Sequence, residues 1–294
     1  MTGKNGPKRE ALRIQDRFEA DIIVVGMDYA GIAAVRAARE TGADVIGLDE
    51  HSCDDLPLAG RNFEHMNSRF MQEHGIGRID TEAITAAWPD EDARSETFDS
   101  IRIWLTHSGE TFDWFTDPLD PEEKARLLVY RYPEEYRPLF PPPPRPEMSA
   151  MLTASRFPEP GPAERASLPD CARLNLELAM GQGANLFFQI SPLRWIEENG
   201  HMCGVIAKRR DGPIYSFSAR KGIILSAGLS MKDVLHKSHA FSVPGRSEIT
   251  RGNFFAGTIR AQESQADVGI GMAITLGRSY GLAAAREYTA LFRE

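Results

Sequence analysis

The sequence predicts an α/β fold built around a parallel sheet, and three observations support that prediction. Residues 22–25 are a continuous β-branched run, as expected of a strand that is covered on both faces. A glycine turn from Gly26 to Gly31 follows and opens an alanine-rich segment with helical periodicity. A second apolar run, residues 43–49, ends in Asp49. Strand, turn, helix and strand in this order are typical of a Rossmann-like dinucleotide-binding unit.

The glycine turn departs from the G-x-G-x-x-G fingerprint at its second position, which is Asp28. Gly26 and Gly31 are kept, and the backbone amides of Tyr29, Ala30 and Gly31 are candidates to face a phosphate at the helix N-terminus. A carboxylate about 4 Å from a phosphate would cost about 1 to 4 kcal/mol, depending on the local dielectric. The alternative role of Asp28 is to cap the helix, by accepting the hydrogen bonds that a phosphate would otherwise accept.

Asp49 is the candidate for a ribose-binding carboxylate, because it follows Gly26 at roughly the 20-residue spacing of that acid in dinucleotide-binding units. Glu50 is its neighbour and the second candidate. An α/β domain that binds no nucleotide remains the alternative, because a glycine turn alone is weak support for a nucleotide site.

Composition limits the classes of partner. A chain of 294 residues with 42% hydrophobic and 26% charged residues is typical of a globular protein with one large domain, or one domain and part of another. The net charge of −8 predicts no nucleic-acid or anionic-membrane surface, which leaves small molecules and proteins as partners. Three cysteines without a C-x-x-C pair favour a reducing compartment. Since no apolar run reaches membrane-spanning length, we expect a cytoplasmic protein that does not contact a membrane.

The segments around this unit differ in composition. Residues 1–19 are polar and are expected to form a flexible arm, and the proline-rich segment 130–162 is expected to be an extended loop. Apolar periodicity predicts helices over residues 63–74, 81–88, 93–114 and 167–181.

The next part of the chain reads as a β-meander inserted in the parallel α/β domain. Asn199-Gly200 and Asp211-Gly212 are typical hairpin turns. The expected strands are residues 185–191, 201–209, 214–218 and 222–226. We expect the last of these, with Ala227, to lie parallel to residues 22–25 in one sheet.

Catalytic and metal-binding patterns are weak in this sequence. His236 and His239 share one helix face, but no third ligand stands out, so a solvated face is the favoured interpretation. Ser226-Ala227-Gly228 lacks the spacing of a nucleophile elbow. We therefore predict no metal site and no catalytic residue from these patterns.

An ordered set of blocks resembles the FAD-dependent fumarate reductase and succinate dehydrogenase flavoprotein family. The blocks are residues 21–49, 66–76, 108–114 (similar to S-G-E-x-x-D-W), 200–207 and 219–228, and together they cover most of residues 20–230. The resemblance implies a Rossmann-like FAD-binding domain with a parallel sheet and an inserted β-meander over residues 20–235. It also implies the beginning of a truncated capping domain over residues 236–294.

The resemblance implies FAD as cofactor and hydride transfer from flavin N5 to an activated C=C bond of a small-molecule substrate. The residues that would bind FAD are Gly26, Tyr29, Ala30, Gly31, Asp49, Glu50, Ser226, Ala227 and Gly228. Family members continue beyond the position of Glu294, and their catalytic arginine lies in that later part, so no residue here inherits a catalytic role. The sequence also departs from the family at Ala227, where a threonine is usual, and at residues 266–273, where the acid of T-G-D-G-I-x-M-A is displaced by one place.

Two expectations concern the C-terminal residues and the alternative function. Helices over residues 268–280 and 282–292 carry apolar side chains such as Ile270, Ile274 and Leu276, which would form an exposed patch and favour self-association. The alternative to an FAD-dependent oxidoreductase is a non-catalytic binding module that keeps the α/β fold without flavin.

Overall fold

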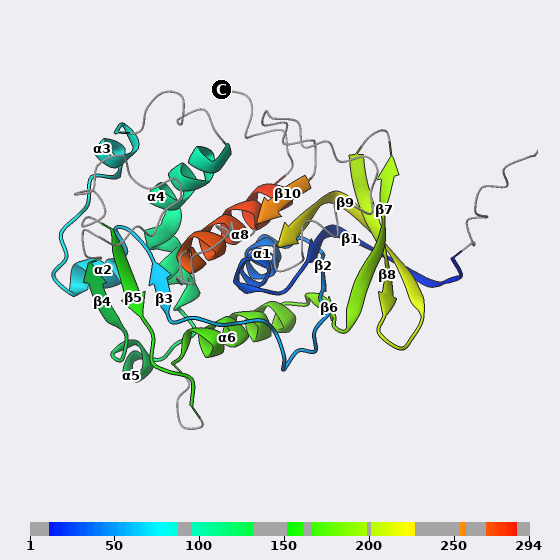
Figure 1. Ribbon diagram of the computed structural model, residues 1–294, viewed down its shortest axis with the longest axis horizontal. Coiled ribbons are helices and arrows are strands. Elements are labelled where there is room, and N and C mark those ends of the chain that lie inside the picture. The colour runs from blue at the N-terminus through cyan, green and yellow to red at the C-terminus, as the bar shows by residue number, and fades with distance from the viewer. Residues whose placement is uncertain are drawn as a thin grey trace, which may run out of the picture.

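The computed structural model of the chain describes residues 12–87, 96–131, 152–161, 166–198, 201–226, 253–256 and 269–286. Within these residues a seven-stranded mixed sheet forms the centre, and helices cover one of its faces (Figure 1). The strand order is β6-β2-β1-β9-β8-β7, with β10 also pairing with β9. Its strands are β1 (Ile14–Val25), β2 (Val45–Leu48), β6 (Asn185–Phe187), β7 (Ile190–Glu198), β8 (His201–Arg209), β9 (Ile214–Ser226) and β10 (Asn253–Ala256).

The parallel part of the sheet confirms the predicted fold class. β1 lies between β2 and β9 and runs parallel to both, with Val25 opposite Leu48 on one side and Leu225 on the other. Residues 222–225 therefore lie beside residues 22–25 as predicted, while Ala227 lies outside the described residues. β7, β8 and β9 are antiparallel and form a β-meander. Its first strand is residues 190–198 and not the expected 185–191, because residues 185–187 form β6 and pair with β2.

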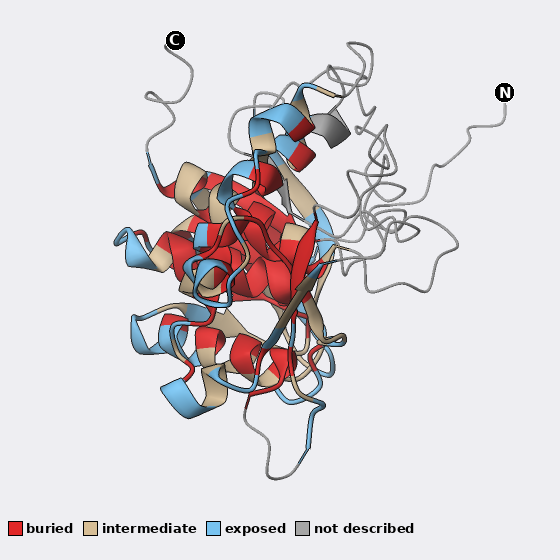
Figure 2. Cartoon of the chain, turned by 90° about the vertical axis from the view of Figure 1, so that its left-hand side faces the viewer, coloured by how far each residue is buried: buried red, intermediate tan, exposed pale blue. Residues whose placement is uncertain are grey.

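Helices α1 (Tyr29–Glu40) and α8 (Ile270–Ala285), which are distant in sequence, pack against one face of the main sheet (Figure 1). The other helices of the described residues are α2 (Arg69–Glu73), α3 (Thr81–Thr85), α4 (Glu96–Phe115), α5 (Pro121–Lys124) and α6 (Leu168–Gly181). Ile22 and Val24 point to the helical face, where they belong to one core with Ile32 and Ile274. Ile23 and Val25 alternate to the other face and pack with residues of the meander. Figure 2 shows that the buried residues gather at the centre of the molecule, where the helices pack on the sheet.

A smaller antiparallel sheet lies beside α4. Its strands are β3 (Asn62–Glu64), β5 (Thr153–Arg156) and β4 (Leu128–Arg131), in the order β3-β5-β4. Phe63 of β3 packs edge-on against Phe112 of α4, at 5.1 Å between ring centroids. The indole nitrogen of Trp104 donates to the carbonyl of Glu64 at 3.0 Å, so the sheet and the helix are joined by both apolar and polar contacts.

Several local expectations are wrong because pairing partners distant in sequence decide the structure. Residues 14–19 are not part of an arm, because they extend β1 along β9. Residues 62–64 form a strand rather than the start of a helix, because β5 supplies their partner, and α2 begins only after Ser68 caps it. Residues 130–131 and 153–156 of the expected proline-rich loop are also in strands, whereas residues 132–151 and 162–165 lie outside the described residues. The expected break between residues 218 and 222 is absent from β9.

Helix α8 corrects the expectation for the C-terminal residues. It is one helix, it packs against α1, and Ile274 and Leu276 are buried, so the predicted exposed patch is wrong for these residues. A Cβ on Gly277 would lie 2.1 Å from the carbonyl oxygen of Ala30, and a Cβ on Gly281 would lie 2.5 Å from that of Ala34. These glycines let the two helix backbones approach closely, and α8 therefore shares a core with α1. The segment holding His236 and His239, and residues 287–294, lie outside the described residues.

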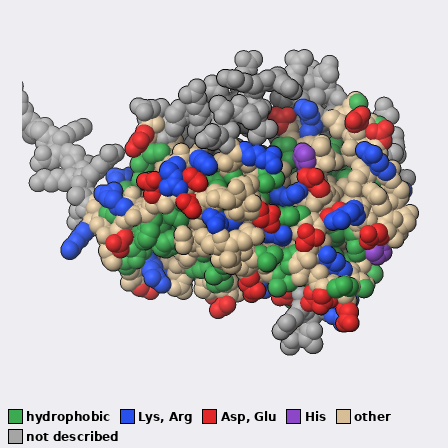
Figure 3. Space-filling view, turned by 180° about the vertical axis from the view of Figure 1, so that it is seen from behind, with side chains coloured by type: hydrophobic (Ala, Val, Ile, Leu, Met, Phe, Trp, Pro, Cys, Tyr) green, Lys and Arg blue, Asp and Glu red, His purple; other side chains and the backbone are tan. Residues whose placement is uncertain are grey.

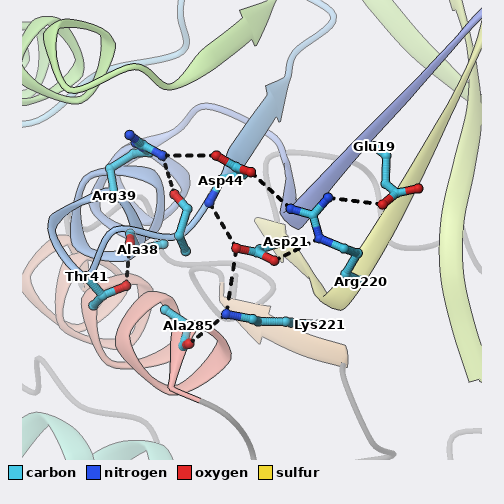
Figure 4. A network of polar contacts seen from close by, with 10 residues as sticks. Glu19, Asp21, Ala38, Arg39, Thr41, Asp44, Arg220, Lys221 and Ala285 are labelled. Carbon is cyan, nitrogen blue, oxygen red and sulfur yellow. Dashed lines mark hydrogen bonds and ion pairs between the residues drawn. The ribbon is translucent and has the colours of Figure 1, made fainter.

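Polar contacts tie the sheet together at the end away from the glycine turn (Figure 4). Arg220 of β9 bonds to the carboxylates of Glu19, Asp21 and Asp44, each at 3.0 Å. Elsewhere, acidic and basic side chains are interspersed over the face shown in Figure 3. None of the helices in the described part of the chain is long and apolar enough to cross a bilayer.

Candidate functional site

The turn after β1 has the backbone geometry of a dinucleotide-binding turn. Gly26 has φ 97°, a left-handed conformation that glycine adopts without strain. A Cβ on Gly31 would lie 1.8 Å from the carbonyl oxygen of Gly26, so only glycine fits at the third position of the fingerprint. A Cβ on Gly26 would also meet the carbonyl oxygen of Ser226 at 3.0 Å, which places the end of β9 directly against the turn.

Asp28 is the N-cap of α1, as the alternative interpretation of the sequence predicted. Its backbone is extended, and its Oδ1 atom accepts hydrogen bonds from the amides of Ala30 and Gly31, both at 3.0 Å. The hydroxyl of Ser226 donates to the same oxygen. Two of the amides that were predicted to face a phosphate are therefore bound to a carboxylate of the chain itself. Tyr29, the first residue of α1, is buried beside them.

Asp49 ties the end of β2 to the glycine turn. Its side chain is buried, and Oδ2 accepts from the backbone amide of Met27 at 2.5 Å. Oδ1 accepts from the backbone amide of His51 at 2.7 Å and lies 2.8 Å from Nδ1 of that ring. The structure therefore brings Asp49 to the turn that holds Asp28, while Glu50 is exposed next to it.

The structure brings most of the predicted site residues together, with Tyr29 buried at the start of α1 and Glu50 exposed. Gly26, Ala30, Gly31 and Ser226 come together around the Asp28 carboxylate, with Asp49 beyond Met27. Ala227 and Gly228 lie outside the described residues. Sequence reasoning missed the contact between Ser226 and Asp28, because the two residues are 198 positions apart and neither position alone indicates a partner.

A cavity of about 390 Å³ borders the Asp49 segment and was not predicted. Its wall includes Phe187, Phe188, Gln189, Arg209 and Tyr215. The carbonyl of Phe187 accepts from the amide of Asp49 at 3.0 Å, and the amide of Gln189 donates to the carbonyl of His51 at 2.9 Å. These bonds join the segment that lines the cavity to the segment that holds Asp49, while the carboxylate of Asp49 is not part of the cavity wall.

Comparison with solved structures identifies proteins of the same fold. An open conformation of a flavocytochrome c3 fumarate reductase matches with a TM-score of 0.52 and 16% identity, over 71% of this chain and 33% of that chain. The 3-ketosteroid-Δ4-(5α)-dehydrogenase from Rhodococcus jostii RHA1, in complex with 4-androstene-3,17-dione, matches with a TM-score of 0.50 and 20% identity, over 71% of this chain and 46% of that chain. E. coli quinol fumarate reductase matches with a TM-score of 0.50 and 13% identity, over 72% of this chain and 33% of that chain.

No family model matches the chain, and no curated protein matches it. The chain spans 33% to 46% of the length of the three solved structures. At these identities the likeness shows the fold. The fold is that of the fumarate reductase and steroid dehydrogenase structures, which confirms the resemblance predicted from the sequence blocks.

Proposed function

We propose that this chain supplies the FAD-binding part of a fumarate-reductase-type oxidoreductase that acts on a small-molecule substrate. The observation that carries the proposal is the joined unit of β1, the glycine turn, α1 and β2, with the Asp49 carboxylate bound to the amide of Met27 in that turn. The fold shared with the flavocytochrome c3 fumarate reductase supports the same conclusion.

The residues present fit the nucleoside half of FAD. A carboxylate at the end of β2 is the group that accepts hydrogen bonds from ribose hydroxyls in dinucleotide-binding units. In Asp49 both oxygens accept from the backbone amides of Met27 and His51, so ribose would share these acceptors. The neighbouring cavity is walled by the aromatic rings of Phe187, Phe188 and Tyr215, which suit a planar base. Bound flavin would supply hydride transfer to an activated C=C bond, and we assign no catalytic residue in this chain.

The pyrophosphate position does not fit in the observed arrangement. A phosphate at the N-terminus of α1 needs the amides of Ala30 and Gly31, and both are bound to Asp28. This observation favours a second candidate function, a binding module that keeps the fold without flavin. The two candidates differ in one property, the affinity of the chain for FAD.

The experiment is a titration of the full chain with FAD, followed by flavin fluorescence and by the absorbance band of bound flavin. The proposal predicts saturable binding that weakens in Asp49→Asn, because the uncharged amide is a poorer acceptor for ribose hydroxyls. Asp117→Asn is the matched control, since Asp117 is an exposed acid outside the wall of the cavity. Binding that Asp49→Asn leaves unchanged, or no binding in wild type and in Asp28→Gly, would contradict the proposal.

We further propose a cytoplasmic location. Cys53, Cys171 and Cys203 are all free thiols in the structure, which supports a reducing compartment.

A further inference from the structure

We infer that Asp28 and Ser226 form an internal latch that takes the place of a pyrophosphate at the N-terminus of α1 and weakens the binding of phosphate-bearing ligands, FAD included. The inference concerns the same turn as the proposed function and rests on that proposal for the class of ligand. It goes further, because it assigns the weaker binding of phosphate to two contacting residues that are 198 positions apart in the sequence.

Three donors surround one oxygen atom of the Asp28 carboxylate. Oδ1 of Asp28 accepts from the amides of Ala30 and Gly31 and from the hydroxyl of Ser226. A phosphate oxygen at a helix N-terminus uses donors of this kind, namely the free amides of the first turn and a nearby hydroxyl. The carboxylate therefore supplies the negative charge that the N-terminus of α1 favours, with no external ligand.

Ser226 is fixed at the turn by its place in the sheet. It is the last residue of β9, it is buried, and its Cβ lies 3.2 Å from the position a Cβ on Gly26 would take. β9 pairs in parallel with β1, and Leu225 lies opposite Val25. Ser226 follows Leu225, so the pairing of the two strands positions its hydroxyl at the turn. The latch is consequently built from two rigid elements and the N-cap of a third.

The latch opposes the binding of pyrophosphate in two ways. A pyrophosphate must displace the carboxylate from two amides and one hydroxyl, and would then lie beside the same negative charge. Repulsion between unit charges about 4 Å apart weakens binding by about fivefold in a water-like dielectric and by about a thousandfold in a lower one. Adenosine has no phosphate, so its binding does not require the latch to open.

The test compares wild type with Asp28→Asn, Asp28→Gly and Ser226→Ala, using inorganic pyrophosphate, FAD and adenosine as probes. Asparagine keeps the shape of the cap and removes its charge, glycine removes the side chain, and Ser226→Ala keeps the Cβ and removes the hydroxyl. Asp80→Asn is the matched control, because Asp80 caps α3 by accepting from Ala83 at 2.9 Å. Calorimetric titration gives the affinities, and thermal unfolding of each variant shows whether it is folded.

We expect Asp28→Asn and Asp28→Gly to bind inorganic pyrophosphate at least about fivefold more tightly than wild type, which corresponds to removing the repulsion of one unit charge. Ser226→Ala is expected to lie between them and wild type. Adenosine binding should be the same in all variants, and Asp80→Asn should behave as wild type. Equal pyrophosphate affinity in wild type and Asp28→Asn would overturn the inference.

The FAD arm separates this inference from the proposed function. Improved pyrophosphate binding without FAD binding in any variant would support the latch and contradict the proposed function. Tight FAD binding that Asp28→Asn leaves unchanged would support the proposed function and overturn the latch. If neither pyrophosphate nor FAD binds to wild type or to any variant, both the inferred latch and the proposed function are contradicted.

Discussion

The carboxylate of Asp49 accepts a hydrogen bond from the backbone amide of Met27, which joins the end of β2 to the turn that follows β1. The bond connects the candidate ribose-binding acid to the glycine turn before any ligand is bound. Asp49 therefore has a structural role in addition to the role proposed for it in FAD binding.

Replacing Asp49 is expected to destabilise the protein. Asp49→Ala leaves the buried amide of Met27 and the amide of His51 without their acceptor, at a cost of about 1 to 3 kcal/mol. Asp49→Asn should cost less, because its amide oxygen can still accept. Urea unfolding of both variants measures the difference, with Asp55→Ala as an exposed control. Equal stability of Asp49→Ala and wild type would show that these bonds contribute nothing.

The close packing of α8 on α1 predicts that Gly277→Ala is strongly destabilising. The new Cβ would lie 2.1 Å from the carbonyl oxygen of Ala30, so the helices must separate, at a cost of about 1 to 3 kcal/mol. Gly181→Ala is the matched control, since Gly181 is the last residue of α6 and its Cβ would meet no atom within 4 Å. That control should be neutral or more stable by up to about 1 kcal/mol. If both variants unfold at the same urea concentration, the packing described for α8 is wrong.

His65 predicts a loss of stability as the pH falls. Complete burial lowers the pKa of His65 from 6.5 to about 3, and the ring stacks on Phe112 at 3.9 Å between centroids. Below pH 6.5 the unfolded chain binds a proton at this position that the folded chain does not bind. The stability is therefore fully present above pH 6.5 and declines towards pH 3, by at most about 1.4 kcal/mol per pH unit.

The measurement for His65 is the free energy of unfolding between pH 7 and pH 4 for wild type and His65→Gln. The glutamine variant should be less stable at pH 7, because it loses the ring contact, and should show a shallower decline. His74→Gln, which alters an exposed histidine, should keep the slope of wild type. A slope that His65→Gln does not change would contradict this assignment.

Arg220 predicts stability that depends on salt. Burial alone would raise the pKa of Asp21, but hydrogen bonds from Arg220 and from the backbone of Asp44 hold it below its ordinary value. Arg220→Gln should lower the melting temperature at low ionic strength, and the difference from wild type should shrink in about 1 M salt, where exposed charges are screened within about 3 Å. Arg102→Gln, which removes an exposed ion pair with Asp99, is the control. A difference that is independent of salt would show that Arg220 acts through packing.

The parts of the fold that could be predicted from the sequence are those in which neighbouring residues decide the structure. The β-branched run 22–25, Gly26 with its left-handed backbone and the alanine-rich α1 follow one another, and each limits the next. The helix α6 was predicted for the same reason, and Ser167 caps it by accepting from the amide of Asp170.

The parts that could not be predicted depend on partners distant in sequence. β3 becomes a strand because it pairs with β5, where Phe63 lies opposite Ser155. Glu64 of β3 lies at the N-terminus of α8, where its carboxylate accepts from the amide of Gly271 at 2.8 Å, although the two residues are 207 positions apart. Likewise, Asp28 could be identified as an obstacle to phosphate from its position alone, but its partner Ser226 required the sheet topology.

The most direct test of the central claim is the crystal structure of Asp28→Gly grown with FAD, read as difference electron density at the glycine turn. The account predicts density for the pyrophosphate at the amides of Ala30 and Gly31 and for the ribose at Asp49. Density for FAD at another place, or an unoccupied turn at millimolar FAD, would contradict the account.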